Sequence, residues 1–115
     1  MNVIYFLLSC CLTGQPQTKF VEIGMASYYS DSFHGKKTAS GEIYDKWDYT
    51  CAHRTLPFGT KLKVINLENK KSVVVKVNDR GPQKRDRIVD LSYAAARDID
   101  MITKGIVKVK IEIIR

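Results

Sequence analysis

The sequence has few of the residues that build a disulfide framework or a metal site. Its 115 residues include three cysteines, at positions 10, 11 and 51, and two histidines. It contains no C-x-x-C motif and none of the cysteine and histidine spacings that are typical of zinc sites. We therefore expect a domain that is not held by disulfides and that has no bound metal or cofactor.

The chain also lacks a basic tail and an aromatic-basic RNA-binding motif. It has 19 lysines and arginines against 12 acidic residues, which gives a formal net charge of +7. Such an excess attracts polyanions, and nucleic acid, anionic lipid and acidic cell-wall polymers all qualify. Because the basic residues are spread over many of the expected strands, we expect no nucleic acid partner.

No charged residue occurs in positions 1–18, and Val3 to Leu8 form an apolar run. The run is too short to span a bilayer but suits an export signal. Residues 7–10 resemble a bacterial lipoprotein box, in which Cys10 would be lipidated; a truncated ordinary signal peptide is the alternative. We expect a signal or lipoprotein segment with a short tether at 1–18 and a folded domain at 19–115. This predicts an exported protein, anchored by lipid to a membrane of the cell envelope and facing the periplasm.

The rest of the chain predicts one small, mainly β domain. Hydrophobic residues make up 44% of the sequence, enough for a modest core. Alternation of apolar and polar residues predicts short strands, and Ser92 is a good N-cap for a single helix over 93–99. Many short strands with one helix indicate a small β-barrel. The expected strands cover 20–29, 50–56, 61–67, 73–79, 88–91 and 106–114.

The strand over 73–79 ends in a carboxylate. Val73, Val75 and Val77 lie on one face, and strict alternation would place Asp79 on the same face. An unpaired carboxylate in a core is costly, and the Gly-Pro pair at 81–82 stops the strand. We therefore expect Asp79 at the rim of the barrel, either in an ion pair with Arg80 or as a catalytic acid.

Five ordered blocks of the sequence resemble the rare lipoprotein A (RlpA) family. They are 24–29 (GMASYY), 33–42 (FHGKKTASGE), 52–60 (AHRTLPFGT), 77–82 (VNDRGP) and 87–96 (RIVDLSYAAA). The resemblance implies a six-stranded double-psi β-barrel, as in expansins. It also implies a lytic transglycosylase that cleaves peptide-poor peptidoglycan glycan strands between N-acetylmuramic acid (MurNAc) and N-acetylglucosamine (GlcNAc), leaving a 1,6-anhydro end. A non-catalytic, expansin-like barrel that binds peptidoglycan or another polysaccharide is the alternative.

Carried over by motif position, the catalytic residues of the family fall on Asp79, Glu42 and His53. A carboxyl at a rim suits the acid and base steps, because partial burial favours its neutral, proton-donating form. Glu42 would bind sugar hydroxyls or steady positive charge, and His53 would hydrogen-bond Asp79 or the sugar. The plainer alternatives are a loop-holding Asp79, a solvated Glu42 and a structural His53.

Other residues have weaker predictions. Tyr28, Tyr29 and Tyr44 are candidates for stacking on sugar rings, although aromatic residues near a barrel often belong to the core. Arg80 could meet the carboxylate of muramic acid or belong to a solvated basic face. Three further residues are singled out. Cys51 is expected to be buried and inert, and Asp100 to adopt a left-handed conformation after the helix. Asp90 is expected to anchor a neighbouring loop, with a place in the site as the alternative.

Overall fold

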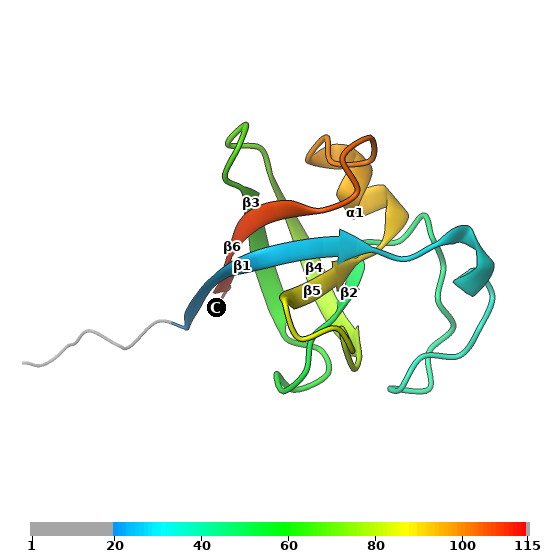
Figure 1. Ribbon diagram of the computed structural model, residues 1–115. Helices are drawn as coiled ribbons and strands as arrows, with labels where there is room; N and C mark the ends of the chain where they lie inside the picture. The colour runs from blue at the N-terminus through cyan, green and yellow to red at the C-terminus, as the bar shows by residue number, and fades with distance from the viewer. Residues whose placement is uncertain (1–19, 115) are drawn as a thin grey trace, which may run out of the picture.

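The computed structural model describes residues 20–114, so the predicted signal segment, the lipidation site Cys10 and the tether lie outside the described residues. Six strands close into a barrel in the order β1-β5-β2-β4-β3-β6, with one α-helix beside it (Figure 1). The elements are β1 (Val21–Tyr28), the short 3₁₀ turn η2 (Asp31–Phe33), β2 (Thr50–Ala52), β3 (Lys61–Asn66), β4 (Ser72–Asp79), β5 (Arg87–Leu91), α1 (Tyr93–Asp98) and β6 (Val107–Ile113).

The barrel mixes parallel and antiparallel pairing. Strands β1 and β5 run parallel, as do β2 and β4, while the other four neighbouring pairs are antiparallel. The mainly β class, the six-stranded barrel and the single short helix are thus confirmed. The stretch expected as a strand over 50–56 is a strand only at Thr50–Ala52, because the chain turns at His53 and leaves the sheet.

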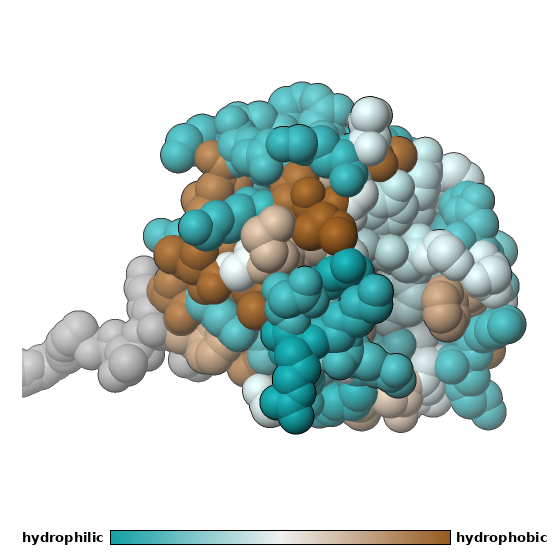
Figure 2. Space-filling model, in the orientation of Figure 1, coloured by the Kyte–Doolittle hydropathy of each residue, from teal (hydrophilic) through white to brown (hydrophobic). Residues whose placement is uncertain are grey.

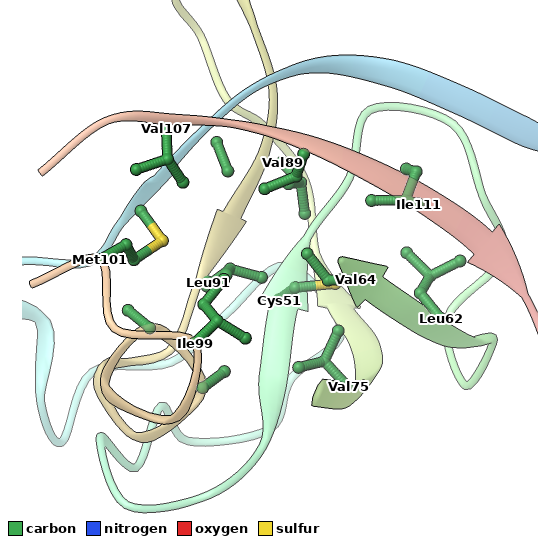
Figure 3. Close-up of a cluster of buried hydrophobic side chains, with 14 of the residues drawn as sticks. Cys51, Leu62, Val64, Val75, Val89, Leu91, Ile99, Met101, Val107 and Ile111 are labelled. Carbon is green, nitrogen blue, oxygen red and sulfur yellow. The ribbon is translucent and has the colours of Figure 1, made fainter. Parts of the chain in front are cut away.

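Alternate residues of the strands fill the barrel (Figure 3). Buried side chains from β2, β3, β4, β5 and β6 point toward one another, and Ile99 and Met101 join them from the segment after α1. Each fully buried valine, leucine or isoleucine contributes roughly 1.5–3 kcal/mol. On the face in Figure 2, hydrophobic residues gather over the strands, whereas the right-hand side of the view is mostly hydrophilic.

The helix is defined by its two ends. Oγ of Ser92 accepts a hydrogen bond from the backbone N–H of Ala95, which is the capping role expected from the sequence. Asp100 has φ = 62°, so the predicted left-handed residue after the helix is confirmed. No helix within residues 20–114 is both long and apolar enough to cross a membrane.

A β-bulge changes the direction of the Asp79 side chain. Cys51 of β2 pairs with Val77 of β4, but the next residue of β2, Ala52, pairs with Asp79, so Asn78 is an extra residue in β4. The expected alternation, with Asp79 on the valine face, is therefore wrong at this point. The bulge turns Asp79 away from the core and onto the outer face, where it is half-buried at the end of the strand.

Candidate active site

The site begins with a row of outward-facing residues across four adjacent strands. Ser27 of β1 pairs with Asp90 of β5, Asp90 pairs with Ala52 of β2, and Ala52 pairs with Asp79 of β4. Paired residues of neighbouring strands point to the same face of a sheet. Two carboxyl groups therefore flank the small side chain of Ala52, on strands that are roughly 10 Å apart.

Asp79 is held by three hydrogen-bond donors. The Tyr29 hydroxyl donates to Oδ2 at 2.5 Å, and the backbone N–H groups of Ala39 and Arg80 donate to Oδ1 at 2.8 and 2.9 Å. Burial, then the hydrogen bond to Asp79, raises the pKa of Tyr29 well above its ordinary value. Tyr29 is therefore a permanent donor, and the Asp79 carboxyl has a fixed orientation.

Asp79 lies in a cleft of about 610 Å³. This volume falls within the range of small-molecule sites in proteins. The cleft runs between the segment after β1 and the loop that joins β4 to β5. Its lining includes Tyr29, Phe33, Asp79, Lys84, Arg87 and Asp90.

Asp90 is the second carboxyl group of the cleft. The Ser27 hydroxyl donates a hydrogen bond to Oδ1 of Asp90. Burial, and to a smaller extent the charge of Asp79, raises the pKa of Asp90. The sequence assigned it mainly to loop anchoring, yet it faces the cleft. Its position between the core residues Val89 and Leu91 was the signal, because alternation places it on the outer face.

Glu42 lies in a second hollow of about 290 Å³, together with Phe58 and Lys76. The Asn78 amide donates to Oε1 at 3.1 Å, and Nζ of Lys76 donates to Oε2 at 3.0 Å. These contacts, the one with Asn78 first, lower the pKa of Glu42. The bulge thus directs two consecutive side chains to different partners, Asn78 to Glu42 and Asp79 to Tyr29. Glu42 is an anion at neutral pH and is not suited to donate a proton.

His53 lies apart from the Asp79 carboxylate. It is 4% exposed, and its Nε2 lies 3.0 Å from Oε1 of Glu22. Nδ1 accepts hydrogen bonds from the backbone N–H groups of Thr55 and Leu56. The expected hydrogen bond between the imidazole and Asp79 is therefore not made; only the backbone N–H of His53 donates to the carbonyl oxygen of Asp79.

The turn that His53 organises supports Arg80. Nη1 of Arg80 donates to the carbonyl oxygens of His53 and Leu56, at 3.1 and 2.8 Å. Its guanidinium carbon lies 4.1 Å from the centre of the Phe58 ring. Arg80 lines the cleft, and these contacts engage Nη1 and one face of its guanidinium. It forms no ion pair with Asp79 among the described residues, so the ion-pair alternative for Asp79 is wrong.

The three tyrosines named from the sequence have different positions. Tyr44 is 2% exposed, and its ring stacks on the Tyr29 ring with centroids 4.3 Å apart. The Tyr44 ring therefore packs against the Tyr29 ring and is too buried to stack on a sugar. The Tyr28 hydroxyl donates to the carbonyl oxygen of Ile102, so its polar end is directed to the body of the protein. Tyr28 and Tyr29 both line the cleft that contains Asp79.

Cys51 is fully buried. Burial, then the charge of Asp90, raises the pKa of its thiol, which keeps it neutral and unreactive. Within residues 20–114 no group of three or more histidine, cysteine, aspartate or glutamate side chains is placed to hold a metal ion. The chemistry that this site offers is proton transfer by carboxyl groups beside an anionic Glu42.

The barrel belongs to a known architectural class. A Streptomyces papain inhibitor superposes with a TM-score of 0.68 at 24% identity, covering 84% of this chain and 96% of that chain. An expansin from Clavibacter michiganensis gives a TM-score of 0.65 at 21% identity, covering 84% of this chain and 51% of that one. The fold is a double-psi β-barrel.

The sequence comparison narrows the class to one family. A family model described as lytic transglycolase matches residues 21–111. The chain belongs to this family of double-psi β-barrel proteins, which is the family of the RlpA proteins.

Two relatives illustrate the match. The endolytic peptidoglycan transglycosylase RlpA of Helicobacter pylori is 56% identical over 88 residues, which is 76% of this chain and 28% of the relative. The protein of the same name from Vibrio cholerae is 53% identical over 95 residues, which is 83% of this chain and 36% of the relative. The chain thus spans about a third of the length of these relatives.

Proposed function

We propose that this protein is an endolytic lytic transglycosylase of peptidoglycan. It cleaves the bond between MurNAc and GlcNAc in peptide-poor glycan strands and leaves a 1,6-anhydro-MurNAc end. The observation that carries the proposal is the Asp79 carboxyl, fixed by Tyr29 and Ala39 in a cleft large enough for sugar rings. The names of the H. pylori and V. cholerae relatives support the same reaction.

Asp79 performs both proton transfers. As an acid it protonates the glycosidic oxygen that leaves with GlcNAc. The 6-hydroxyl of muramic acid then attacks the anomeric carbon and gives its proton back to the Asp79 carboxylate. The carboxyl group ends as it began, and no water is consumed, so a single acid/base residue is sufficient.

The neighbouring residues support this cycle. Tyr29 and Ala39 orient the Asp79 carboxyl, which lowers the entropic cost of reaching the reactive geometry. Glu42, an anion beside Asn78 and Lys76, binds sugar hydroxyls or steadies the positive charge that develops on the ring. Asp90 is the second carboxyl of the cleft and the alternative proton donor. His53 acts as a positioning residue through the turn that holds Arg80.

Cys10 is the proposed site of lipid attachment, and the cell envelope is the proposed location. The short apolar run and the box at 7–10 support this part of the proposal. Metabolic labelling with a fatty acid analogue tests it, with Cys10→Ala as the variant and Cys11→Ala as the matched control. Label that survives in Cys10→Ala would remove the anchor from the proposal.

The alternative function is a glycan-binding barrel without turnover. It is favoured by the likeness of the fold to an expansin that has been crystallised, as a mutant, with cellohexaose. The deciding experiment incubates the purified protein with peptide-free glycan strands and analyses the products by mass spectrometry. Strands that bind without yielding 1,6-anhydro ends would support the binding role and reject the enzyme.

If products form, the acid/base role is tested by Asp79→Asn, which should abolish them while binding persists. Asp48→Asn is the matched control, because Asp48 is exposed and lines neither the Asp79 cleft nor the Glu42 hollow. Turnover that survives in Asp79→Asn would transfer the acid/base role to another group, with Asp90 the first candidate.

A further inference from the structure

Arg87 is a cleft residue whose positive charge partly offsets the rise in the pKa of Asp90, and whose guanidinium makes no hydrogen bond among residues 20–114. It is the first residue of β5, and its side chain lines the cleft that contains Asp79 and Asp90. The side chain is 21% exposed, and its Nε atom is buried. Burying a charged group is costly unless hydrogen bonds or an opposite charge replace the water.

The hydrogen bond is the part of that replacement that Arg87 lacks. Nε of Arg87 is buried and has no hydrogen-bond acceptor among residues 20–114. The nearest carboxylate oxygen recorded for it, Oδ1 of Asp86, is 3.9 Å away, and the Asp86 side chain is 77% exposed. This distance exceeds that of a hydrogen bond, so Asp86 leaves the donor unsatisfied.

Three other arginines of the described residues make hydrogen bonds or an ion pair through their guanidinium groups. Arg54 donates to the carbonyl oxygen of Lys84, Arg80 donates to two carbonyl oxygens, and Arg97 pairs with Asp98. Arg85 is exposed to solvent. Arg87 is thus the arginine of residues 20–114 that combines burial with an unsatisfied donor. A guanidinium with an unsatisfied donor that lines a cleft is an expected feature of a site for an anionic ligand.

The loop around Arg87 is held in place before any ligand binds. The backbone N–H of Arg87 donates to the carbonyl oxygen of Lys84 at 3.2 Å, and Nη2 of Arg54 donates to the same oxygen at 2.6 Å. The backbone that carries the Arg87 side chain therefore does not have to be ordered at the moment of binding, which reduces the entropic cost of recognition.

The chemistry of the ligand follows from the charge. The sugar rings of an alternating GlcNAc–MurNAc strand carry hydroxyl and acetamido groups, which are neutral. The lactyl ether of muramic acid carries the one carboxyl group of each disaccharide. That carboxyl is an anion when it is free and becomes a neutral amide when a stem peptide is attached. A guanidinium binds a carboxylate through two parallel hydrogen bonds, which an amide cannot accept in the same way.

We propose that Arg87 binds the free lactyl carboxylate of a muramic acid residue in the Asp79 cleft, and that this contact selects peptide-free glycan. The inference rests on the proposed function, because it assumes that the cleft receives peptidoglycan. The inference adds to that function the residue that recognises the free carboxylate of the substrate. Arg87 is a specificity-determining residue, and the proton transfers remain with the carboxyl groups.

Binding to two glycans tests the proposal. One is peptide-free glycan strands, and the other is the same strands with every lactyl carboxyl converted to a methylamide. The wild-type protein should bind the free-carboxylate strands at least about 10-fold more tightly, since hydrogen bonds to charged groups have this strength. Arg87→Gln should lose that preference, while its affinity for the amidated strands stays within about twofold of wild type.

Arg85→Gln is the matched control, because it removes the same charge from the same loop at an exposed position outside the cleft. It should keep the preference. Arg87→Lys keeps the positive charge but not the two parallel N–H donors, so it should retain part of the preference for free-carboxylate strands. If Arg87→Gln does not unfold cooperatively, Arg87→Lys is used in its place.

Three results would overturn the proposal: no preference in the wild type, full preference in Arg87→Gln, or equal weakening toward both glycans. Equal weakening toward both glycans would mean that Arg87 supports the structure around Asp90 and does not bind the carboxylate. Turnover is measured separately on the same strands. Preference for the carboxylate without 1,6-anhydro products would reject the proposed enzyme and keep Arg87 as the reader of the glycan.

Discussion

The Tyr29 hydroxyl and Oδ2 of Asp79 are 2.5 Å apart, so an aromatic residue after β1 fixes the carboxyl at the end of β4. Tyr29→Phe keeps the ring on Tyr44 and removes only this donor. We expect turnover of glycan strands to fall about 10- to 100-fold, the cost of losing a hydrogen bond to a charged group. Tyr28→Phe is the control, because its hydroxyl bonds the carbonyl oxygen of Ile102. Unchanged turnover in Tyr29→Phe would show that the other two donors are sufficient.

His53→Ala separates positioning from direct contact with substrate. The substitution leaves the N–H groups of Thr55 and Leu56 without their acceptor. We expect the free energy of unfolding to fall by about 1–3 kcal/mol, as for other buried donors that lose a partner. Thermal and denaturant unfolding measure this effect. A stable variant that has lost turnover would instead place His53 in contact with the sugar.

Glu42→Gln tests the anionic group of the second hollow. Glutamine can still accept from Asn78, so we expect the fold to survive while turnover falls about 10-fold or more from the loss of charge stabilisation. Because its contacts lower the pKa of Glu42, the carboxylate should add no step to the pH profile of turnover near neutrality. Glu68→Gln is the control, since Glu68 is exposed and pairs with Lys104. Equal turnover in the two variants would reduce Glu42 to a solvated side chain.

Asp90 should make stability depend on pH in an identifiable direction. Its pKa is raised in the folded state, so the folded protein holds this proton more tightly than the unfolded chain. The wild-type protein therefore loses stability as the pH rises from the ordinary aspartate pKa of about 4 through the raised folded value. Asp90→Asn removes this loss, so the variant should be the more stable protein at neutral pH and the difference should vanish below pH 4.

Denaturant unfolding across pH 3–8 measures the effect. Asp86→Asn is the control, because that side chain is largely exposed. If Asp90 also serves the reaction, Asp90→Asn should lose turnover while it gains stability. A neutral-pH loss of stability in Asp90→Asn would mean that the charged form is favoured by the fold, contrary to the burial of the group.

Local sequence signals predicted most of the barrel but not the direction of every side chain. Alternation places Leu62 and Val64, or Val107 and Val109, in the core because each pair depends only on its own strand. Ser92 was predictable for the same reason, since a helix cap acts over three residues.

The misses depend on partners far along the chain. Asp79 faces outward because Asn78 bulges against Ala52, a strand pairing that periodicity within 73–79 does not contain. His53 is held by Glu22, which lies 31 residues earlier. The family resemblance named His53 but not its partner. Arg87 gave no signal, because an unsatisfied donor is recognised only when its surroundings are known.

The row that joins Ser27, Asp90, Ala52 and Asp79 has a consequence for when the protein can act. Its four residues come from four strands, and Ser27 and Asp90 are separated by 63 positions in the chain. These strands become neighbours only when the barrel closes. An incompletely folded chain therefore has no arrangement of paired carboxyl groups, and the proposed cleavage is latent until folding is complete. The proposed cleavage of the cell wall is in this way confined to the finished domain.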